Sequence, residues 1–196
     1  MMRPAAAIAA LCTLAGLVAG CGSTPASRFY TLSGTATPVP PATPLPVSVA
    51  VGPVSVPGTV DRPQIVVNTS ANQVEVDEFH RWASPLQSNI SRAVAENLVA
   101  LLGASRVTQT LGVNSDFHVA IEVQRFESTP GDSAMLDAAW LVRRAKDGKI
   151  ETGRTTVREP VAQKGYDALV AAHSRAIGRL SQDIANTLRT LDSVPR

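Results

Sequence analysis

The chain has 196 residues, which suffices for one domain of ordinary size and a short extension. Its 18 basic and 16 acidic side chains give a formal charge of +2 without a cluster of positive charge, so nucleic acid is excluded as a partner. Both cysteines, Cys12 and Cys21, lie near the N-terminus, and the rest of the chain can therefore form neither an internal disulfide nor a thiolate metal site.

The first 20 residues have the three parts of a secretory signal peptide. Arg3 supplies positive charge, residues 8–18 form a short apolar segment, and Ala19 and Gly20 are small residues at a cleavage point. A membrane-spanning helix needs about 20 apolar residues, and this segment is shorter. We therefore expect residues 1–20 to be removed from the mature protein.

The residues Val18-Ala19-Gly20-Cys21 resemble a bacterial lipobox. In that motif the cysteine is acylated and becomes the new N-terminus, and several acyl chains on one residue hold a soluble domain at the bilayer. Gly22, and not an aspartate, follows the cysteine, and the resemblance then implies sorting to the outer membrane. A plain signal peptide followed by an incidental cysteine is the alternative.

Residues 21–46 have the composition of a lipidated tether with a proline-rich linker. Closely spaced prolines favour extended conformations there: Pro38, Pro40, Pro41, Pro44 and Pro46. Residues 29–32, Phe-Tyr-Thr-Leu, are too apolar for a spacer, and we expect them to dock on the domain as an edge strand. The globular domain is expected to comprise residues 47–196.

Alternating apolar residues predict strands in the first part of this domain. Val47, Val49 and Val51 alternate with small or polar residues, as in a strand with one buried face. Residues 64–67 and 73–76 form two further short strands. Trp82 closes the region and is expected to be a buried anchor.

A first amphipathic helix follows. Ser84 is its expected N-cap, Pro85 its first helical residue, and Gly103 the left-handed residue that ends it. One apolar stripe runs along the helix: Leu86, Ile90, Val94, Leu98, Leu101 and Leu102. Such a stripe packs against a sheet.

Three strands are expected after this helix. Residues 106–110 form a weak strand, and residues 117–123 alternate between apolar and polar, which predicts a polar outer face. Residues 135–142 are apolar on both faces, as in a central strand.

Asp147-Gly148 then marks a hairpin turn to residues 149–158, because this dipeptide tolerates positive φ angles. Residues 166–191 carry a second apolar helical face. The expected fold class is therefore α/β, with two amphipathic helices packed on a mixed or largely antiparallel sheet in two layers.

Residues capable of catalysis do not form a recognisable motif. His80 lies in a charged stretch that we expect to be solvated, His118 falls on the polar face of its strand, and His173 lies near the apolar face of the last helix. The side chains of Asp77 and Glu78 are expected to point to opposite faces of a strand, so this pair is poorly arranged for shared acid-base work. There is no nucleophile elbow or phosphate-binding glycine loop, and we expect no enzyme, cofactor or metal site.

Several short motifs occur in one order along the mature chain. They are Arg-Phe-Tyr-Thr-Leu at residues 28–32, Val-Gly-Pro-Val-Ser-Val-Pro at 51–57, Asp-Arg-Pro-Gln-Ile-Val at 61–66, Arg-Trp-Ala-Ser-Pro-Leu at 81–86 and Tyr-Asp-Ala-Leu-Val at 166–170. As an ordered set they resemble the PqiC-type lipoproteins, also described as ABC-type transport auxiliary lipoprotein components. The likeness covers nearly the whole mature chain.

This resemblance implies a non-enzymatic lipoprotein on the periplasmic face of the outer membrane. It implies as partner an MCE-domain (PqiB-like) protein, whose stacked rings form a tunnel across the periplasm for lipids, with phospholipid as the candidate cargo. It also implies a homo-oligomeric ring that receives the tunnel and a role in envelope integrity.

In this interpretation Cys21 carries the lipid and Gly22 directs sorting. Arg62, Gln64 and Ile65 could contribute to a partner or subunit surface, although a proline-led edge strand that merely packs is the alternative.

Two other functions stay open. A structural envelope lipoprotein without a transport role would have the same anchor and fold. A lipid-tethered periplasmic hydrolase would need a pocket that gathers His80 or His118 with a serine and a carboxylate.

Overall fold

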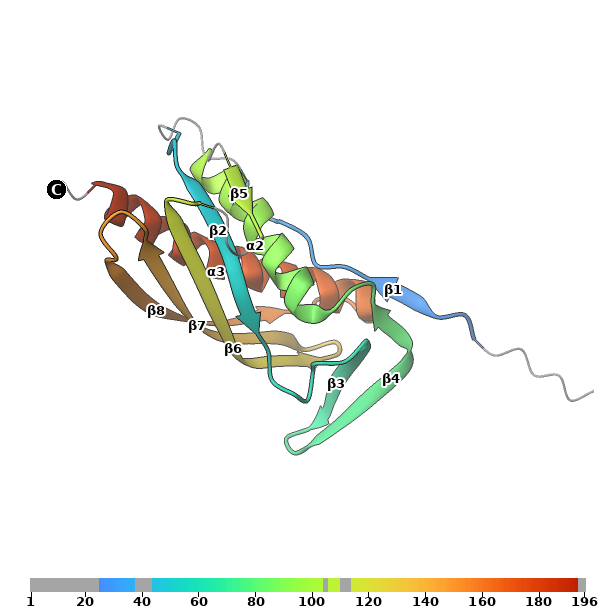
Figure 1. The fold of residues 1–196 in the computed structure, drawn as a ribbon. Coiled ribbons are helices and arrows are strands. Elements are labelled where there is room, and N and C mark those ends of the chain that lie inside the picture. The colour runs from blue at the N-terminus through green and yellow to red at the C-terminus, as the bar shows by residue number, and fades with distance from the viewer. Residues whose placement is uncertain (1–24, 38–43, 104–105, 110–113, 194–196) are drawn as a thin grey trace, which may run out of the picture.

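The structure is a computed structural model that describes residues 25–37, 44–103, 106–109 and 114–193. The signal peptide, Cys21 and Gly22 lie outside the described residues. Two helices pack on mixed β-sheets (Figure 1), which confirms the expected α/β class. The strands are divided between a five-stranded and a three-stranded sheet.

The larger sheet has the strand order β5-β2-β6-β7-β8. Its strands are β2 (Ser48–Ser55), β5 (Arg106–Thr108), β6 (Phe117–Thr129), β7 (Ser133–Arg144) and β8 (Ile150–Pro160). β2 pairs in parallel with β5 and β6, whereas β6, β7 and β8 are antiparallel. As predicted, β7 has a neighbour on each side, and the turn to β8 places Gly148 at φ 72°.

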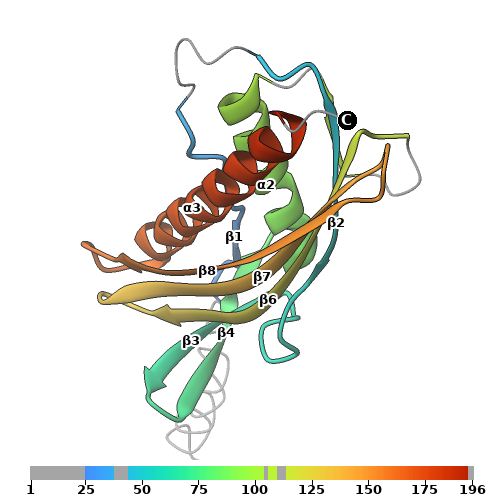
Figure 2. The same ribbon diagram turned by 90° about the vertical axis from the view of Figure 1, so that its left-hand side faces the viewer.

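The smaller sheet has the order β1-β4-β3. It contains β1 (Arg28–Tyr30), β3 (Gln64–Ser70) and β4 (Gln73–Trp82). β3 and β4 form an antiparallel hairpin that projects beyond the larger sheet (Figure 2). β1 is an edge strand that pairs in parallel with β4, and Leu32 just after it is fully buried. This confirms the predicted docking of residues 29–32.

The helices are α2 (Leu86–Leu102) and α3 (Tyr166–Ser193). As predicted, α2 ends at Gly103, which is left-handed at φ 57° and ψ 29°. The predicted N-cap is wrong by one residue. Pro85 has an extended backbone with ψ 138° and takes the cap position, while the Ser84 carbonyl accepts a hydrogen bond from Asn89 Nδ2 at 2.9 Å.

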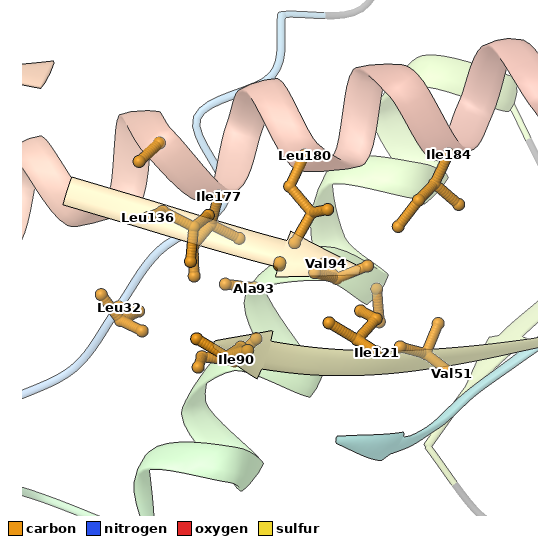
Figure 3. Packing of buried hydrophobic residues seen from close by; sticks show 14 of the residues in the cluster. Leu32, Val51, Ile90, Ala93, Val94, Ile121, Leu136, Ile177, Leu180 and Ile184 are labelled. Atoms are coloured by element: carbon orange, nitrogen blue, oxygen red, sulfur yellow. The ribbon is translucent and has the colours of Figure 1, made fainter. Parts of the chain in front are cut away.

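Both helices cover the same face of the larger sheet and bury the core against it (Figure 2). Ile90 and Val94 of α2, Ile177 and Leu180 of α3, and Leu136 of β7 lie together between the layers (Figure 3). All five are fully buried. Burying each such side chain contributes about 1.5–3 kcal/mol, so the apolar stripes of the sequence define this layer.

The prediction of a single buried face is wrong for the first half of β2. Ser48 and Ala50 are buried along with Val49 and Val51. The amide and the hydroxyl of Ser48 both donate to Asp116 Oδ2 at 2.7 Å. The Ser48 side chain therefore has a hydrogen-bond partner without water, and the second face of β2 can be buried as well.

Candidate functional site

The candidate site is the junction at which the N-terminal segment joins the domain. β1 lies at one end of the domain (Figure 1). Alternate residues of a strand point to opposite faces, and here Tyr30 is 8% exposed whereas Phe29 is 64% exposed. The inner face of β1 therefore holds the segment on the domain, and the outer face presents an aromatic ring to solvent.

On the inner face, three rings from β1, β4 and α3 form a stack. The ring centroid of His80 lies 5.8 Å from that of Tyr30 and 3.9 Å from that of Tyr166. Stacked rings attract one another beyond the area that they bury, so the stack joins β1 to the start of α3. The expectation that His80 is solvated is wrong, because β1 and α3 place tyrosine rings against it and leave it half-buried.

Asp77 is the charged partner of this stack. Its Oδ2 accepts a hydrogen bond from the Tyr166 hydroxyl at 2.7 Å, and its Oδ1 accepts the backbone N–H groups of Phe79 and His80 at 2.8 and 3.0 Å. The same Oδ1 lies 2.9 Å from His80 Nδ1, but the two atoms are not aligned as in a hydrogen bond.

These contacts determine the charge states of Asp77 and Tyr166. Burial raises the pKa of Asp77, but the hydrogen bonds from Tyr166 and the backbone, together with the contact to His80, outweigh burial and lower it to about 2. Burial and the hydrogen bond to Asp77 in turn raise the pKa of Tyr166. At neutral pH the ionised carboxylate of Asp77 therefore accepts a hydrogen bond from the neutral phenol of Tyr166.

Residues 32–36, here named the strap, cross from β1 over both helices. On α2, the N–H groups of Thr35 and Ala36 each donate to Oδ1 of Asn97 at 2.8 Å. Asn97 is 1% exposed, and its Nδ2 donates to Ser181 Oγ of α3 at 3.1 Å. One buried amide thus connects the strap to both helices.

On α3 the strap approaches the helix backbone closely. The Ser33 N–H donates to Ser174 Oγ at 3.2 Å, and the Thr35 hydroxyl donates to the Ser174 carbonyl at 3.3 Å. A Cβ at Gly178 would lie 2.5 Å from the Thr35 hydroxyl oxygen, so a larger residue there would displace this hydroxyl. No sequence pattern predicted the strap. The available signal was a glycine inside a helix, which costs about 1 kcal/mol relative to alanine.

The outer face of β1 continues into the surface predicted from the sequence. Phe29 is paired with Arg81 of β4, which in turn is paired with Gln64 of β3. The Glu78 carboxylate accepts hydrogen bonds from Gln64 Nε2 at 3.2 Å and from Arg81 at 3.4 Å. Phe29, Gln64, Glu78 and Arg81 together are named the outer-sheet surface.

The three residues predicted for a partner surface have different environments. Arg62 is exposed and Gln64 is half-buried at the outer-sheet surface. Ile65 is 1% exposed and packs in the core, because successive strand residues face opposite sides. The prediction for Ile65 is therefore wrong, and Arg62 and Gln64 stay predictions.

A buried serine–histidine pair was also missed from the sequence. Ser128 Oγ lies 2.8 Å from Nε2 of His173, whose ring stacks on Phe126 with a centroid separation of 3.9 Å. No described residue bonds to His173 Nδ1, so the carboxylate that orients a catalytic histidine is missing from this part of the chain. Burial lowers the pKa of His173 to about 3, which makes the ring a neutral packing group.

The pocket beside His118 gathers serines and a carboxylate, as a hydrolase would require. It contains Ser48, Ser115 and Asp116. Asp116 binds Ser48 directly, and His118 forms no hydrogen bond with any described residue. The contact between base and nucleophile that a hydrolase needs is thus not formed.

The described ranges contain neither a membrane-spanning helix nor a cluster of metal-ligating side chains. Neither α2 nor α3 combines the length and apolar character needed to span a bilayer. Within the same ranges, no three His, Cys, Asp or Glu side chains gather as a metal site would require.

Comparison with solved structures identifies proteins of the same fold. A crystal structure of an uncharacterized protein has a TM-score of 0.69 at 21% identity, covering 84% of this chain and 99% of the other. A crystal structure of a DUF330 protein from Xanthomonas campestris has a TM-score of 0.68 at 21% identity, covering 81% and 93%. No significant match is found among curated proteins.

Comparison with family models matches residues 30–185, from the inner residue of β1 into the last turns of α3. The match thus includes the ring stack, the strap and both sheets. Because it spans most of the chain, this protein belongs to the family of ABC-type transport auxiliary lipoprotein components.

Proposed function

We propose that this protein is an outer-membrane lipoprotein that serves an MCE-type intermembrane lipid transport system. Membership of a transport auxiliary lipoprotein family supports a membrane-anchored accessory role. In the proposal Cys21 is acylated, and Gly22 at the sorting position directs the protein to the periplasmic face of the outer membrane. A homo-oligomeric ring of domains then docks the tunnel of the MCE-domain protein, with phospholipid as the cargo.

The observation that carries this proposal is the shortness of the chain between Cys21, the proposed anchor, and the first strand of the domain. The chain from Cys21 to Arg28, the first residue of β1, spans at most roughly 25 Å when fully extended. The ring stack at Tyr30 and the strap then fasten the segment to the domain. A domain held this close to a bilayer suits a protein that receives a tunnel at the membrane.

We assign the contact with the tunnel protein or the next subunit to the outer-sheet surface together with Arg62. Aromatic and arginine side chains are enriched at the centres of protein interfaces. Phe29 and Arg81 supply both kinds beside the exposed Arg62. Glu78 holds Arg81 in place, so part of the surface is ordered before a partner binds.

The proposal is tested by affinity purification of the lipidated protein from membranes, followed by mass spectrometry. We expect an MCE-domain protein to co-purify with the wild type and to be depleted with Cys21→Ala and with Arg62→Glu. Arg158→Glu is the matched control, because Arg158 is an exposed arginine on β8 of the larger sheet.

Failure to recover an MCE-domain protein, with the wild type lipidated and folded, would favour the structural envelope lipoprotein. Sizing of the purified protein in detergent tests the ring separately. A monomer at micromolar concentration would overturn that part of the proposal.

A further inference from the structure

A pocket rich in hydrogen-bond donors lies at the end of the domain remote from β1. It has a volume of about 620 Å³ and is lined by the starts of β2 and β6, the end of β7 and the C-terminal end of α3. β1 and the C-terminal end of α3 lie at opposite ends of the domain (Figure 1). The pocket is therefore separate from the membrane-proximal junction.

Three of its side chains have donors that no described residue accepts. Ser115 is 6% exposed, and its buried hydroxyl has no partner. His118 is half-buried, and its ring forms no hydrogen bond within the described part of the chain. The guanidinium of Arg143 likewise forms no ion pair or hydrogen bond there. Buried polar groups are normally hydrogen-bonded, so the Ser115 hydroxyl indicates a missing acceptor.

The rim of the pocket carries more positive than negative charge. Arg106 donates to the neutral carbonyl of Asn114 at 3.2 Å, and Lys146 also lines the pocket. The facing carboxylates are Asp116 and Asp192. Asp116 Oδ2 already accepts two hydrogen bonds from the start of β2, which leaves the free donors of the pocket in excess.

One basic side chain of the pocket, Arg144, has a structural role in the fold. Arg144 binds Asp147 through two nitrogens, at 3.0 and 2.6 Å, and donates to the Leu191 carbonyl near the end of α3. Arg144 therefore provides a donor to a carbonyl at the C-terminal end of α3 and is not available to a ligand. Arg143 beside it has no such structural role.

We propose that this pocket binds a phosphate group, either free or as the phosphodiester of a lipid headgroup. A tetrahedral oxyanion accepts several hydrogen bonds at once and suits a pocket that contains guanidinium, ammonium, hydroxyl and imidazole donors. The excess of positive charge at the rim selects an anion over a neutral ligand. If the phosphate belongs to a lipid, the pocket is connected to the proposed transport function. Binding of free phosphate would be independent of that function.

The test is a titration of the full mature chain in detergent with two probes. One probe is inorganic phosphate, and the other is glycerophosphoethanolamine, a headgroup phosphodiester without acyl chains. Calorimetry measures affinity, and the ring resonances of His118 report whether the probe enters this pocket. We expect saturable binding of at least one probe with a shift of those resonances.

Arg143→Gln is expected to weaken binding roughly tenfold or more, because it removes a charged donor. Arg125→Gln is the matched control, since Arg125 is an exposed arginine on β6 that pairs with Glu127 and lies outside the pocket. Both variants change exposed side chains and are expected to fold, which their urea midpoints verify.

Tighter binding of the phosphodiester supports a lipid headgroup, and tighter binding of inorganic phosphate supports a free anion. The proposal is overturned if neither probe binds saturably, if Arg143→Gln leaves the affinity unaltered, or if both arginine variants weaken binding equally. None of these results depends on recovering an MCE-domain protein, so this proposal and the proposed function can fail separately.

Discussion

Gly153 of β8 provides a sharp test of the packing between the larger sheet and α3. It is paired with Trp140 of β7 on the helix-facing side. A Cβ at Gly153 would lie 2.5 Å from Cη2 and 2.7 Å from Cε2 of the indole. Trp140 is 8% exposed, and its Nε1 donates to Thr155 Oγ1 at 3.1 Å, which in turn donates to Asp183 of α3 at 2.6 Å.

Gly153→Ala would force the indole to move by about 1 Å to restore an ordinary contact distance. Overpacking of this kind costs about 1–3 kcal/mol, and losing the indole hydrogen bond costs about 1 kcal/mol more. The lower entropy of the unfolded alanine chain offsets about 0.4–1 kcal/mol. We expect a net destabilisation of about 2 kcal/mol, which corresponds to a decrease in Tm of about 4–8 °C for a protein of this size.

Urea unfolding followed by tryptophan fluorescence measures this change. Gly58→Ala is the control, because a Cβ there meets no atom within 4 Å. The cost of Gly153→Ala should fall when Trp140→Leu is also present, since the two positions are in contact. Equal stabilities of Gly153→Ala and Gly58→Ala would refute the reasoning.

Three further predictions concern the junction and the buried histidine. Asn97→Ala should release the strap, because the N–H groups of Thr35 and Ala36 lose their acceptor. Faster amide hydrogen exchange at these two residues would detect the release. The free energy of unfolding should decrease by about 1–3 kcal/mol. Tyr166→Phe should raise the pKa of Asp77 from about 2, as carboxyl carbon chemical shifts would report, because a hydrogen bond to the carboxylate is removed. His173→Leu should abolish part of the acid sensitivity. The pKa of His173 in the folded protein, about 3, lies below the ordinary histidine value of 6.5, so the unfolded state binds more protons. The free energy of unfolding of the wild type should therefore fall by about 2 kcal/mol between pH 7 and pH 5.

Each of these predictions can be contradicted by a measurement, and the first has a matched control. Asn186→Ala changes an exposed asparagine of α3 and should leave exchange in the strap unaltered. Unchanged protection in Asn97→Ala would contradict the role of the strap, and an unshifted Asp77 would contradict the role of the phenol. For His173 the decisive comparison is how the free energy of unfolding depends on pH. Equal slopes for variant and wild type would show that the ring takes up a proton in the folded state as it does in the unfolded state, which would contradict the prediction.

Local sequence features predicted the elements well, because their causes are local. Gly103 and Gly148 adopt positive φ angles as expected, at the end of a helix and in a hairpin turn. The apolar stripes of α2 and α3 are buried as predicted, since a helix that packs on a sheet buries one face. The errors lie where a distant segment covers a residue, as β1 and α3 cover His80.

The candidate site could be predicted only in part. Docking of residues 29–32 followed from their apolar character, but the acceptor of the strap, Asn97, did not. A polar residue within a helix does not reveal whether it faces solvent or a segment remote in sequence. The pair of Ser128 and His173 was missed for the same reason, because hydrogen-bond partners on different elements depend on how those elements pack.

By itself the sequence determined the type and order of the elements, the apolar faces that form the core, and the family to which the chain belongs. Only the tertiary structure decided that the strands divide into two sheets, that the strap crosses both helices, and that donors from several elements converge in one pocket. Periodicity specifies which face of an element is buried but not what buries it. Which element covers a given face depends on the parallel pairing of β1 with β4 and of β2 with β5 and β6. These pairings join segments that no local sequence pattern relates.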